Sequence, residues 1–175
     1  MEIYKGIATF SGIAIGKVLY YSRGEYQIRQ CLVSNIKKEI SDFQEARLQA
    51  VHKLHELYEA SRLLNEQEAR VFLRQIKLLE SESYQNAIES SIAHEKVNAA
   101  YAVMINRDEL VETFRNLEEP VIRRRINDMQ EISNRLIQIL GGAAIRINLG
   151  DEPVILVAEA LSPTEIMEMD KDKLL

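Results

Sequence analysis

The fold is decided by residues 35–64, which read NIKKEISDFQEARLQAVHKLHELYEASRLL. Apolar residues recur in this stretch at steps of three and four, a spacing that places them on one face of an α-helix. The apolar stripe consists of Ile36, Ile40, Phe43, Ala50, Leu54, Leu57 and Leu64. At 1.5 Å per residue the predicted helix is roughly 45 Å long. A helix of this length with one apolar side must pack against other helices.

Four further helices are predicted between this helix and residue 140. Their expected ranges are Glu66 to Glu80, about Tyr84 to Ile92, Asn98 to about Phe114, and Pro120 to Leu140. Asn98 can cap a helix, and Pro120 suits a first helical turn. Ser81-Glu82-Ser83 is expected to separate two helices, and Gly141-Gly142 to end the last one. Because the links between successive helices are short, the sequence predicts an antiparallel bundle.

Strand signals stand at both ends of the chain. The first 21 residues are rich in glycine and β-branched residues, which suits two short strands joined by a tight turn near Ser11-Gly12. Near the other end, Ala144 to Leu149 alternates loosely, and Val154 to Ala158 is the continuous apolar run of a buried strand. Ser162-Pro163-Thr164-Glu165 then predicts a short helix, because the serine can cap it and the glutamate can reach back to the cap.

Strands at the ends and helices between them predict an α+β fold, mainly α, in which an antiparallel helical bundle is inserted into a partial α/β domain. We expect the first part of that α/β domain in residues 1–30, the helical domain in residues 31–142, and the second, incomplete part in residues 143–175. So few strands would leave an open edge and a thin core. We therefore expect more sequence to follow Leu175 in the parent protein.

Composition excludes several classes of function. With 46% apolar residues the chain can fill a real core, and 27 acidic against 22 basic residues give a net charge of −5. This balance argues against a nucleic-acid surface, because neutralising phosphates requires a basic excess. No apolar run approaches the ~20 residues that cross a bilayer, and the first residues lack the order of a signal peptide. We expect a cytoplasmic protein that binds neither nucleic acid nor membrane.

The residues that often carry chemistry form no recognisable site. His52 and His55 stand three apart on the first helix, but no carboxylate or third histidine completes a metal motif. His94 falls near the end of the third predicted helix, where its partial positive charge complements the carbonyl groups. Cys31, the single cysteine, excludes an intrachain disulfide and is expected to be a plain thiol. No catalytic residue and no metal site are assigned.

Two surface features remain open from the residues alone. The second predicted helix has two apolar sides, so it needs a second neighbour, which is either another helix of the bundle or a docking protein. One side holds Phe72, Ile76 and Leu79, and the other holds Val71, Gln75, Leu78 and Glu82. The cluster Arg123-Arg124-Arg125 could bind an anionic partner. The alternative is a solvated face, since Asp128 and Glu131 lie close enough to pair with the cluster.

A series of motifs in chain order resembles the N-terminal part of enzyme I of the bacterial phosphoenolpyruvate:sugar phosphotransferase system. Gly6-Ile7 followed by Gly12-Ile13-Ala14-Ile15-Gly16-Lys17 resembles the family's opening G-I-x-x-x-x-G-I-A-x-G-K. Phe72 to Glu80 resembles its carrier-binding helix, and Asp128 to Leu136 resembles its D-x-x-x-I-x-x-R-L. Val154 through Pro163 resembles its V-I-L-V-A-x-x-L-T-P. The resemblance covers essentially the whole chain.

The resemblance implies that the parent protein passes phosphate from phosphoenolpyruvate through a histidine to the carrier protein HPr. In that family a helical HPr-binding domain is inserted into an α/β phosphohistidine domain, and Mg²⁺ is expected in the full-length parent. The family's histidine, in a G-G-x-T-S-H segment, would fall shortly after Leu175. This chain is therefore expected to be an inactive fragment without a cofactor of its own. The parent is expected to be a homodimer formed through a C-terminal domain that this chain lacks.

The resemblance assigns HPr docking to the second helix, its end, and one residue of the last helix. These residues are Glu66, Glu68, Gln75, Lys77, Leu78, Glu82 and Arg125. Leu78 would supply affinity, and the charges would set orientation. Three departures stand at Gln75, where the family usually has histidine, Ser81, where it usually has aspartate, and Ile166, where it commonly has a threonine that helps hold the active histidine.

Two alternatives to an enzyme I of the sugar phosphotransferase system remain open. One is a regulatory or binding paralogue that keeps the bundle but uses it to sense or sequester a carrier. The other is an enzyme I-like segment of a multidomain phosphotransfer protein that serves a kinase rather than a sugar permease.

Overall fold

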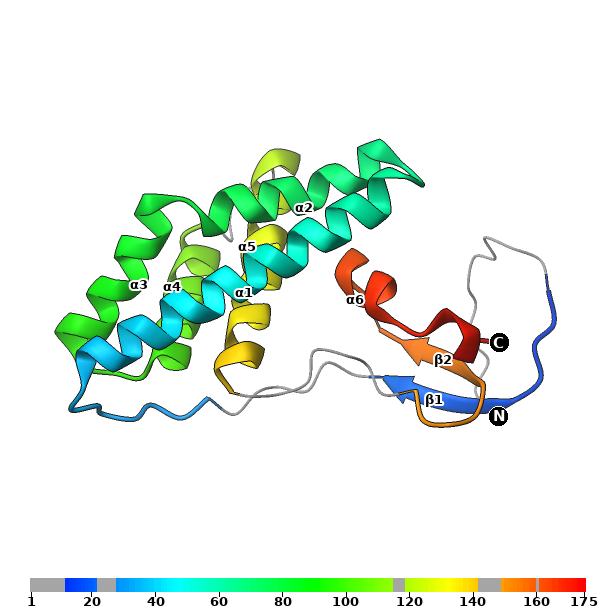
Figure 1. Ribbon diagram of the computed structural model, residues 1–175, viewed down its shortest axis with the longest axis horizontal. Helices are drawn as coiled ribbons and strands as arrows, with labels where there is room; N and C mark the ends of the chain where they lie inside the picture. Colours follow the sequence, from blue (N-terminus) through cyan, green and yellow to red (C-terminus); the bar gives the residue numbers. More distant parts are fainter. Residues whose placement is uncertain (1–11, 22–27, 115–118, 142–148, 160) are drawn as a thin grey trace. The chain divides into compact units, whose positions relative to one another are not determined.

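A computed structural model gives the fold of the chain and describes residues 12–21, 28–114, 119–141, 149–159 and 161–175, except the side chains of Glu68 and Thr164 (Figure 1). The chain divides into two compact units. One comprises residues 25–145, and the other comprises residues 1–24 and 146–175. The first unit is helical and the second contains a small parallel sheet, so the predicted fold class, α+β and mainly α, is confirmed.

The helical unit contains five helices in the order that the sequence predicts. They are α1 (Ile36–Arg62), α2 (Glu66–Leu79), α3 (Glu82–Glu95), α4 (Ala99–Phe114) and α5 (Pro120–Leu140). The predicted break between the second and third helices exists, but it is shorter than expected because Ser81 stands at the N-cap and α3 already begins at Glu82. Gly141 follows the last residue of α5, and its N–H donates to the carbonyl of Ile137.

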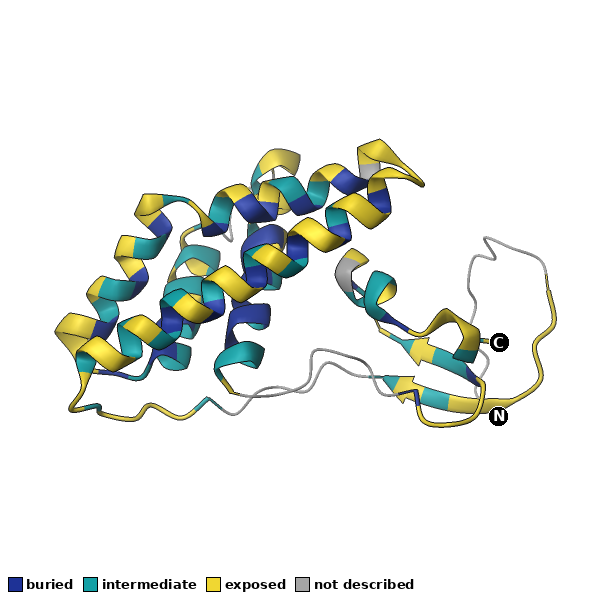
Figure 2. Cartoon of the chain, in the orientation of Figure 1, coloured by how far each residue is buried: buried dark blue, intermediate teal, exposed yellow. Residues whose placement is uncertain are grey.

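The core of this unit is built around α1, which packs against each of the other four helices. Figure 2 shows buried positions along the sides of the helices that face one another. Four members of the predicted stripe are buried, namely Phe43, Ala50, Leu54 and Leu57. Leu64 was predicted to belong to this stripe but is 77% exposed. The helix ends at Arg62, so Leu64 lies in the turn before α2 rather than on the inner face.

A carboxylate of α1 satisfies the first turn of α4. The first amides of a helix have no partner within it and need one from elsewhere. Asn98 was predicted to supply a cap, but its Oδ1 accepts a hydrogen bond from the N–H of Cys31 at 2.9 Å. The N–H of Ala99 donates instead to Oε2 of Glu39, also at 2.9 Å. The start of α4 is thus held by a residue 60 positions earlier in the chain.

The second unit contains two parallel strands, β1 (Lys17–Tyr21) and β2 (Val154–Ala158), paired in register from Lys17 with Val154 to Tyr21 with Ala158. Of the two strands predicted in residues 1–21, one lies in the described part. The other, with Ser11 of its turn, lies outside it, as does most of the run from Ala144 to Leu149. At the start of β2, the N–H of Leu175 donates to the carbonyl of Val154 at 3.0 Å.

A short helix, α6 (Pro163–Glu168), follows β2 and precedes the 3-10 turn η1 (Lys171–Lys173). Its predicted capping box is confirmed, because Oγ of Ser162 accepts from the N–H of Glu165 and the Glu165 carboxylate accepts from the N–H of Ser162. The same carboxylate accepts a hydrogen bond from the hydroxyl of Tyr21 at 2.7 Å. This contact ties the end of β1 to the start of α6.

Among the residues that the structure describes, no helix combines the length and the apolar content that crossing a membrane would require.

Two hydroxyl groups are enclosed in the helical core. Tyr84 of α3 and Ser133 of α5 are buried, and neither side-chain oxygen has a hydrogen-bond partner among the described residues. Loss of solvent around the phenol, partly opposed by the nearby Ser133 hydroxyl, raises the pKa of Tyr84 from its ordinary value of 10.0 to about 12. Folding therefore disfavours the phenolate.

We predict that the free energy of unfolding falls as the pH rises from 10 toward 12, because the unfolded chain loses the Tyr84 proton first. Below pH 10 the contribution is fully present. In Tyr84→Phe, the decrease in the free energy of unfolding over this pH range should be smaller by roughly 3 kcal/mol. Urea unfolding followed by circular dichroism over that pH range measures the effect. Tyr101→Phe, at a half-buried position of α4, should keep the loss, and an unchanged pH dependence in Tyr84→Phe would contradict the prediction.

Candidate functional site

Helix α2 separates its side chains into a buried and an exposed side. Its buried apolar residues are Ala69, Phe72, Ile76 and Leu79, which recur at the helical spacing. Glu66, Arg70, Arg74 and Lys77 are exposed. The helix packs against α1 and also against α5, so the two neighbours leave this charged side facing solvent.

The predicted docking residues occupy different depths around this exposed side. Glu66 and Lys77 are exposed on α2, and Leu78 beside them is half-buried. Glu82 is exposed in the first turn of α3, and Arg125 is exposed on α5. The side chain of Glu68 lies outside the described part of the chain, although the residue belongs to α2.

Gln75 has the placement that least suits direct contact with a partner. Gln75 is 3% exposed and therefore buried, so its amide does not lie on the surface. The neighbours along its side of α2, Val71 and Leu78, are half-buried. The sequence left open whether the second apolar side of α2 is covered by another helix of the bundle or by a docking protein. Because α5 packs against α2, a helix of the bundle covers at least part of that helix.

An ion pair that the sequence did not reveal joins α2 to α5. Nε of Arg74 lies 2.9 Å from Oδ2 of Asp128, with the arginine side chain 48% exposed and the aspartate side chain 9% exposed. The two residues are 54 positions apart, so no local pattern could have predicted their contact. A carboxylate this well buried needs such a partner.

This ion pair changes the surroundings of the arginine cluster. Asp128 was expected to be available to Arg123, Arg124 or Arg125, but its carboxylate is held by Arg74. All three arginines of the cluster are exposed, and no carboxylate in the described part of the chain forms an ion pair with them. On α2, Arg70 lies 3.7 Å from Glu66, both in exposed positions.

The histidines and the cysteine remain separate surface groups. His52, His55 and His94 are exposed, and His94 lies in the last turn of α3 as predicted. Nε2 of His52 is 3.4 Å from Glu56, a contact that becomes an ion pair only when the imidazole is protonated. Cys31 is exposed. Across the described ranges, no three or more His, Cys, Asp or Glu side chains are grouped so that they could hold a metal ion.

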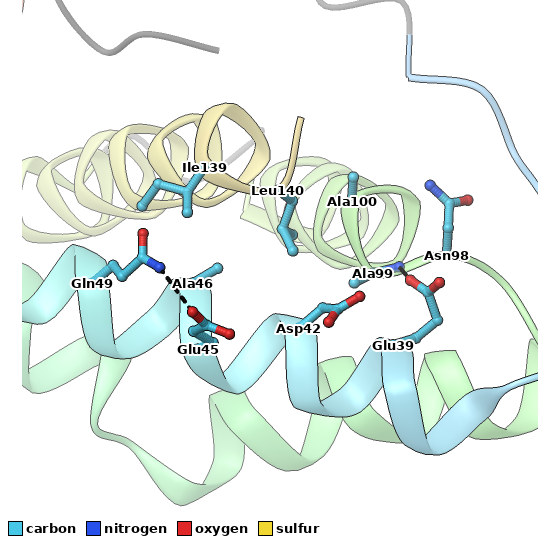
Figure 3. A pocket seen from close by; sticks show the side chains of 10 residues that line it. All are labelled: Glu39, Asp42, Glu45, Ala46, Gln49, Asn98, Ala99, Ala100, Ile139 and Leu140. Atoms are coloured by element: carbon cyan, nitrogen blue, oxygen red, sulfur yellow. Dashed lines mark hydrogen bonds between the residues drawn. The ribbon is translucent and has the colours of Figure 1, made fainter. Parts of the chain in front are cut away.

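A groove of about 400 Å³ opens between α1, the start of α4 and the end of α5 (Figure 3). Its walls include Glu39, Asp42 and Glu45 of α1 and Ile139 of α5. Each of the three carboxylates already forms a hydrogen bond or an ion pair within the bundle. Glu39 accepts from the Ala99 N–H, Asp42 pairs with Lys38 at 2.6 Å, and Glu45 accepts from Gln49. None of the predicted docking residues lines this groove.

The site residues therefore divide into two groups. Because α2 packs against both α3 and α5, we group the residues on its exposed side, in the first turn of α3 and at the start of α5 as one candidate. We call it the α2–α5 surface, and it consists of Glu66, Val71, Lys77, Leu78, Glu82 and Arg125. Ile166, the third departure from the family pattern, belongs to the other unit and is 46% exposed on α6.

Comparison with known families and proteins gives consistent matches. Residues 5–125 match the family model described as PEP-utilising enzyme, N-terminal. The chain is 30% identical to the phosphoenolpyruvate-protein phosphotransferase of Haemophilus influenzae over 97% of this chain and 30% of that protein. It is 27% identical to the phosphoenolpyruvate-protein phosphotransferase of Mycoplasma capricolum, over 95% of this chain and 30% of the relative. The chain thus spans about 30% of the length of these curated relatives.

Two solved structures share the fold. The solution NMR structure of an Enzyme I protein superimposes with a TM-score of 0.74 at 23% identity, covering 91% of this chain and 66% of the other. The structure of the N-terminal domain of Enzyme 1 - Nitrogen gives a TM-score of 0.69 at 22% identity, covering 93% of this chain and 68% of the other.

We predict that Arg74→Met lowers the free energy of unfolding by about 1 to 3 kcal/mol, because it leaves the buried Asp128 carboxylate without its partner. Arg70→Met, which removes an exposed arginine of the same helix, should cost less than about 1 kcal/mol. Urea unfolding of both variants measures the difference. When Asp128 is already replaced by Asn, adding Arg74→Met should lower the free energy of unfolding by less than it does in the native chain. If the effects of the two substitutions simply add, the ion pair does not contribute to stability.

Proposed function

Because the chain belongs to the family of PEP-utilising enzyme N-terminal domains, and is homologous to the N-terminal part of enzyme I, we propose that its α2–α5 surface docks an HPr-type phosphocarrier protein. In the full-length protein this docking would bring the carrier to a phosphorylated histidine, which takes its phosphate from phosphoenolpyruvate. The names of the curated relatives describe the transfer of a phosphoryl group from phosphoenolpyruvate to a protein.

The observation that carries the proposal is the unfinished packing of α2. Leu78 is half-buried although it lies on a helix that already has α1 and α5 as neighbours. Around it stand the exposed charges of Lys77, Glu82 and Arg125. A small apolar centre with a charged rim is the usual composition of a protein–protein interface. The apolar part supports affinity, while the rim charges support orientation and rate of association.

The chain's own residues would bind and orient the carrier rather than transfer phosphate. His52, His55 and His94 are exposed on helices of the bundle and do not match the family's histidine motif. We assign the phosphorylated histidine, the Mg²⁺ and the phosphoenolpyruvate site to parts of the full-length protein outside this sequence. Gln75 is buried, so it would contribute to the packing of α2 rather than contact the carrier.

A non-catalytic paralogue that only docks a carrier is the second candidate, and Ile166 is the observation that favours it. Isoleucine cannot form the hydrogen bond that the family's threonine supplies near the active histidine. Incubating the full-length protein with phosphoenolpyruvate, Mg²⁺ and an HPr-type carrier separates the two. Phosphorylated carrier supports the phosphotransferase, whereas tight binding without phosphorylation supports the paralogue.

We predict that Leu78→Ala weakens binding of an unphosphorylated HPr-type carrier on the order of tenfold, because it removes the apolar centre of the interface. Leu48→Ala is the matched control, since Leu48 is a 58% exposed leucine on α1. Calorimetric titration measures both affinities, and urea unfolding checks that the variants remain folded. An NMR titration should shift signals of Lys77, Leu78 and Arg125. Shifts confined to α1, or equal losses in both variants, would defeat the docking assignment.

A further inference from the structure

The groove between α1, α4 and α5 contains apolar surface that the described helices leave uncovered (Figure 3). Its lining includes the buried Ala46 and Ala99 and the half-buried Ile139 and Leu140. The last two belong to the final turn of α5, whereas Leu136, one turn earlier, is completely buried. The volume of about 400 Å³ is within the range of ligand-binding pockets. The bundle therefore offers a recess that another molecule can fill.

One wall of this groove is acidic. Glu39, Asp42 and Glu45 follow one another at steps of three along α1, and none of the residues that line the groove is basic. Lys38 pairs with Asp42, but it is exposed and does not line the groove. Figure 3 shows the apolar residues at the end of α5 across the groove from this wall. The groove thus combines an apolar side with a negatively charged side.

Each of the three carboxylates keeps one oxygen for an incoming donor. Their contacts use Oε2 of Glu39, Oδ2 of Asp42 and Oε1 of Glu45. In the described part of the chain, no further hydrogen bond or ion pair involves any of the three. An ionised carboxylate can accept hydrogen bonds at both of its oxygens. The wall can therefore bind a cationic donor without giving up the contacts that hold the bundle together.

The end of α5 adds to the negative potential of the groove. A helix carries a partial negative charge at its C-terminus, which a basic residue in the last turn can offset. The last turn of α5 contains no basic residue, and its final residue, Leu140, lines the groove. The N-terminus of α4 has the opposite polarity, but the N–H of Ala99 already donates to Glu39. The groove therefore attracts a positively charged group.

We propose that this groove binds a polypeptide segment of another protein that presents a lysine or arginine next to an apolar side chain. The apolar side chain would pack on Ile139 and Leu140, and the cation would lie against Asp42 and Glu45. The acidic wall repels nucleic acids and anionic lipid surfaces, because both are negatively charged. No residue of the α2–α5 surface lines the groove, so this partner and a carrier do not compete for the same residues.

A polypeptide segment fits the groove better than a small cation does. Glu45 is exposed and Asp42 is half-buried, and ion pairs at such positions contribute little because water and salt screen them. A segment that also covers the apolar residues of α5 gains from the hydrophobic effect. The apolar contact supports affinity, and the charges fix the orientation of the segment.

The test titrates the whole chain with a short capped peptide in which lysine and leucine alternate. Asp42→Asn/Glu45→Gln removes two charges from the groove and keeps Glu39, which holds the start of α4. Glu56→Gln/Glu59→Gln is the matched control, because both carboxylates are exposed, lie on α1 outside the groove and have ion-pair partners. We expect calorimetry to show a loss on the order of tenfold in affinity for the groove variant and much less for the control. The loss should shrink at high ionic strength.

A second pair of variants tests the shape of the groove without changing its charge. Ala100 is half-buried and lines the groove, so Ala100→Leu should partly fill it and weaken peptide binding. Ala93→Leu places the same side chain at an exposed position of α3 and should leave the affinity unchanged. Circular dichroism and urea unfolding report whether each variant remains folded. This pair keeps the proposal testable even if the charge variant fails to fold.

The outcomes decide what occupies the groove. Peptide binding that shifts the NMR signals of Ile139 and Leu140, and that both groove variants weaken, supports the proposal. No binding to the native chain, or equal losses in the groove and control variants, would overturn it. Spermidine that binds as tightly as the peptide would assign the groove to small cations instead. Self-association of the chain that the groove variants abolish would assign it to a second copy.

Binding of an HPr-type carrier, measured in parallel, separates this inference from the docking function. We expect both groove variants to bind the carrier as the native chain does, because the groove and the α2–α5 surface share no residue. Loss of carrier binding in the folded groove variants would contradict the independence of the two surfaces. Failure of the peptide to bind leaves the proposed docking function as it stands.

Discussion

Burial of one side of α1 is the constraint on which the bundle depends. Phe43, Ala50 and Leu54 are completely buried, and α1 packs against every other helix of its unit. Enclosing a large apolar side chain contributes about 1.5 to 3 kcal/mol, so a stripe of this length is the dominant local source of stability. Helix α2 packs mainly against α1, whereas α4 packs more extensively against α3 and α5 than against α1. The sides of α2 and α5 that face solvent are therefore available as a contact surface for another protein.

The α2–α5 surface is therefore partly a consequence of how α2 is held. This helix rests on α1 with one side and meets α5 with another, and Arg74 fastens the second contact to the buried Asp128. The charge of Asp128 is thereby committed to the interior of the bundle. Asp128 is therefore not available to pair with Arg123, Arg124 or Arg125, which precede it on α5. An internal requirement for a paired carboxylate thus leaves an external excess of positive charge.

Local features of this fold could be predicted from the sequence, whereas contacts between distant residues could not. The helices follow from apolar periodicity, and the capping box of Ser162 and Glu165 follows from residues three positions apart. The cap of α4 by Glu39 and the pair of Arg74 with Asp128 join residues 60 and 54 positions apart, for which one sequence carries no signal. For the same reason the burial of Gln75 was not foreseen, since it depends on how the neighbouring helices pack around α2. The docking roles of Lys77, Leu78 and Arg125 remain predictions that rest on resemblance.

The hydrogen bond from Tyr21 to Glu165 has a consequence for the order in which the chain folds. These residues are 144 positions apart, and β1 and β2 pair across nearly the same separation. If the intervening segment were a flexible coil, closing so long a loop for two short strands would cost far more conformational entropy than their few hydrogen bonds recover. A folded bundle replaces most of that coil, and it brings the start of α1 near the end of α5, because Glu39 and Leu140 line the same groove. The small sheet is therefore thermodynamically subordinate to the bundle, and its strands lose their partner when the bundle unfolds.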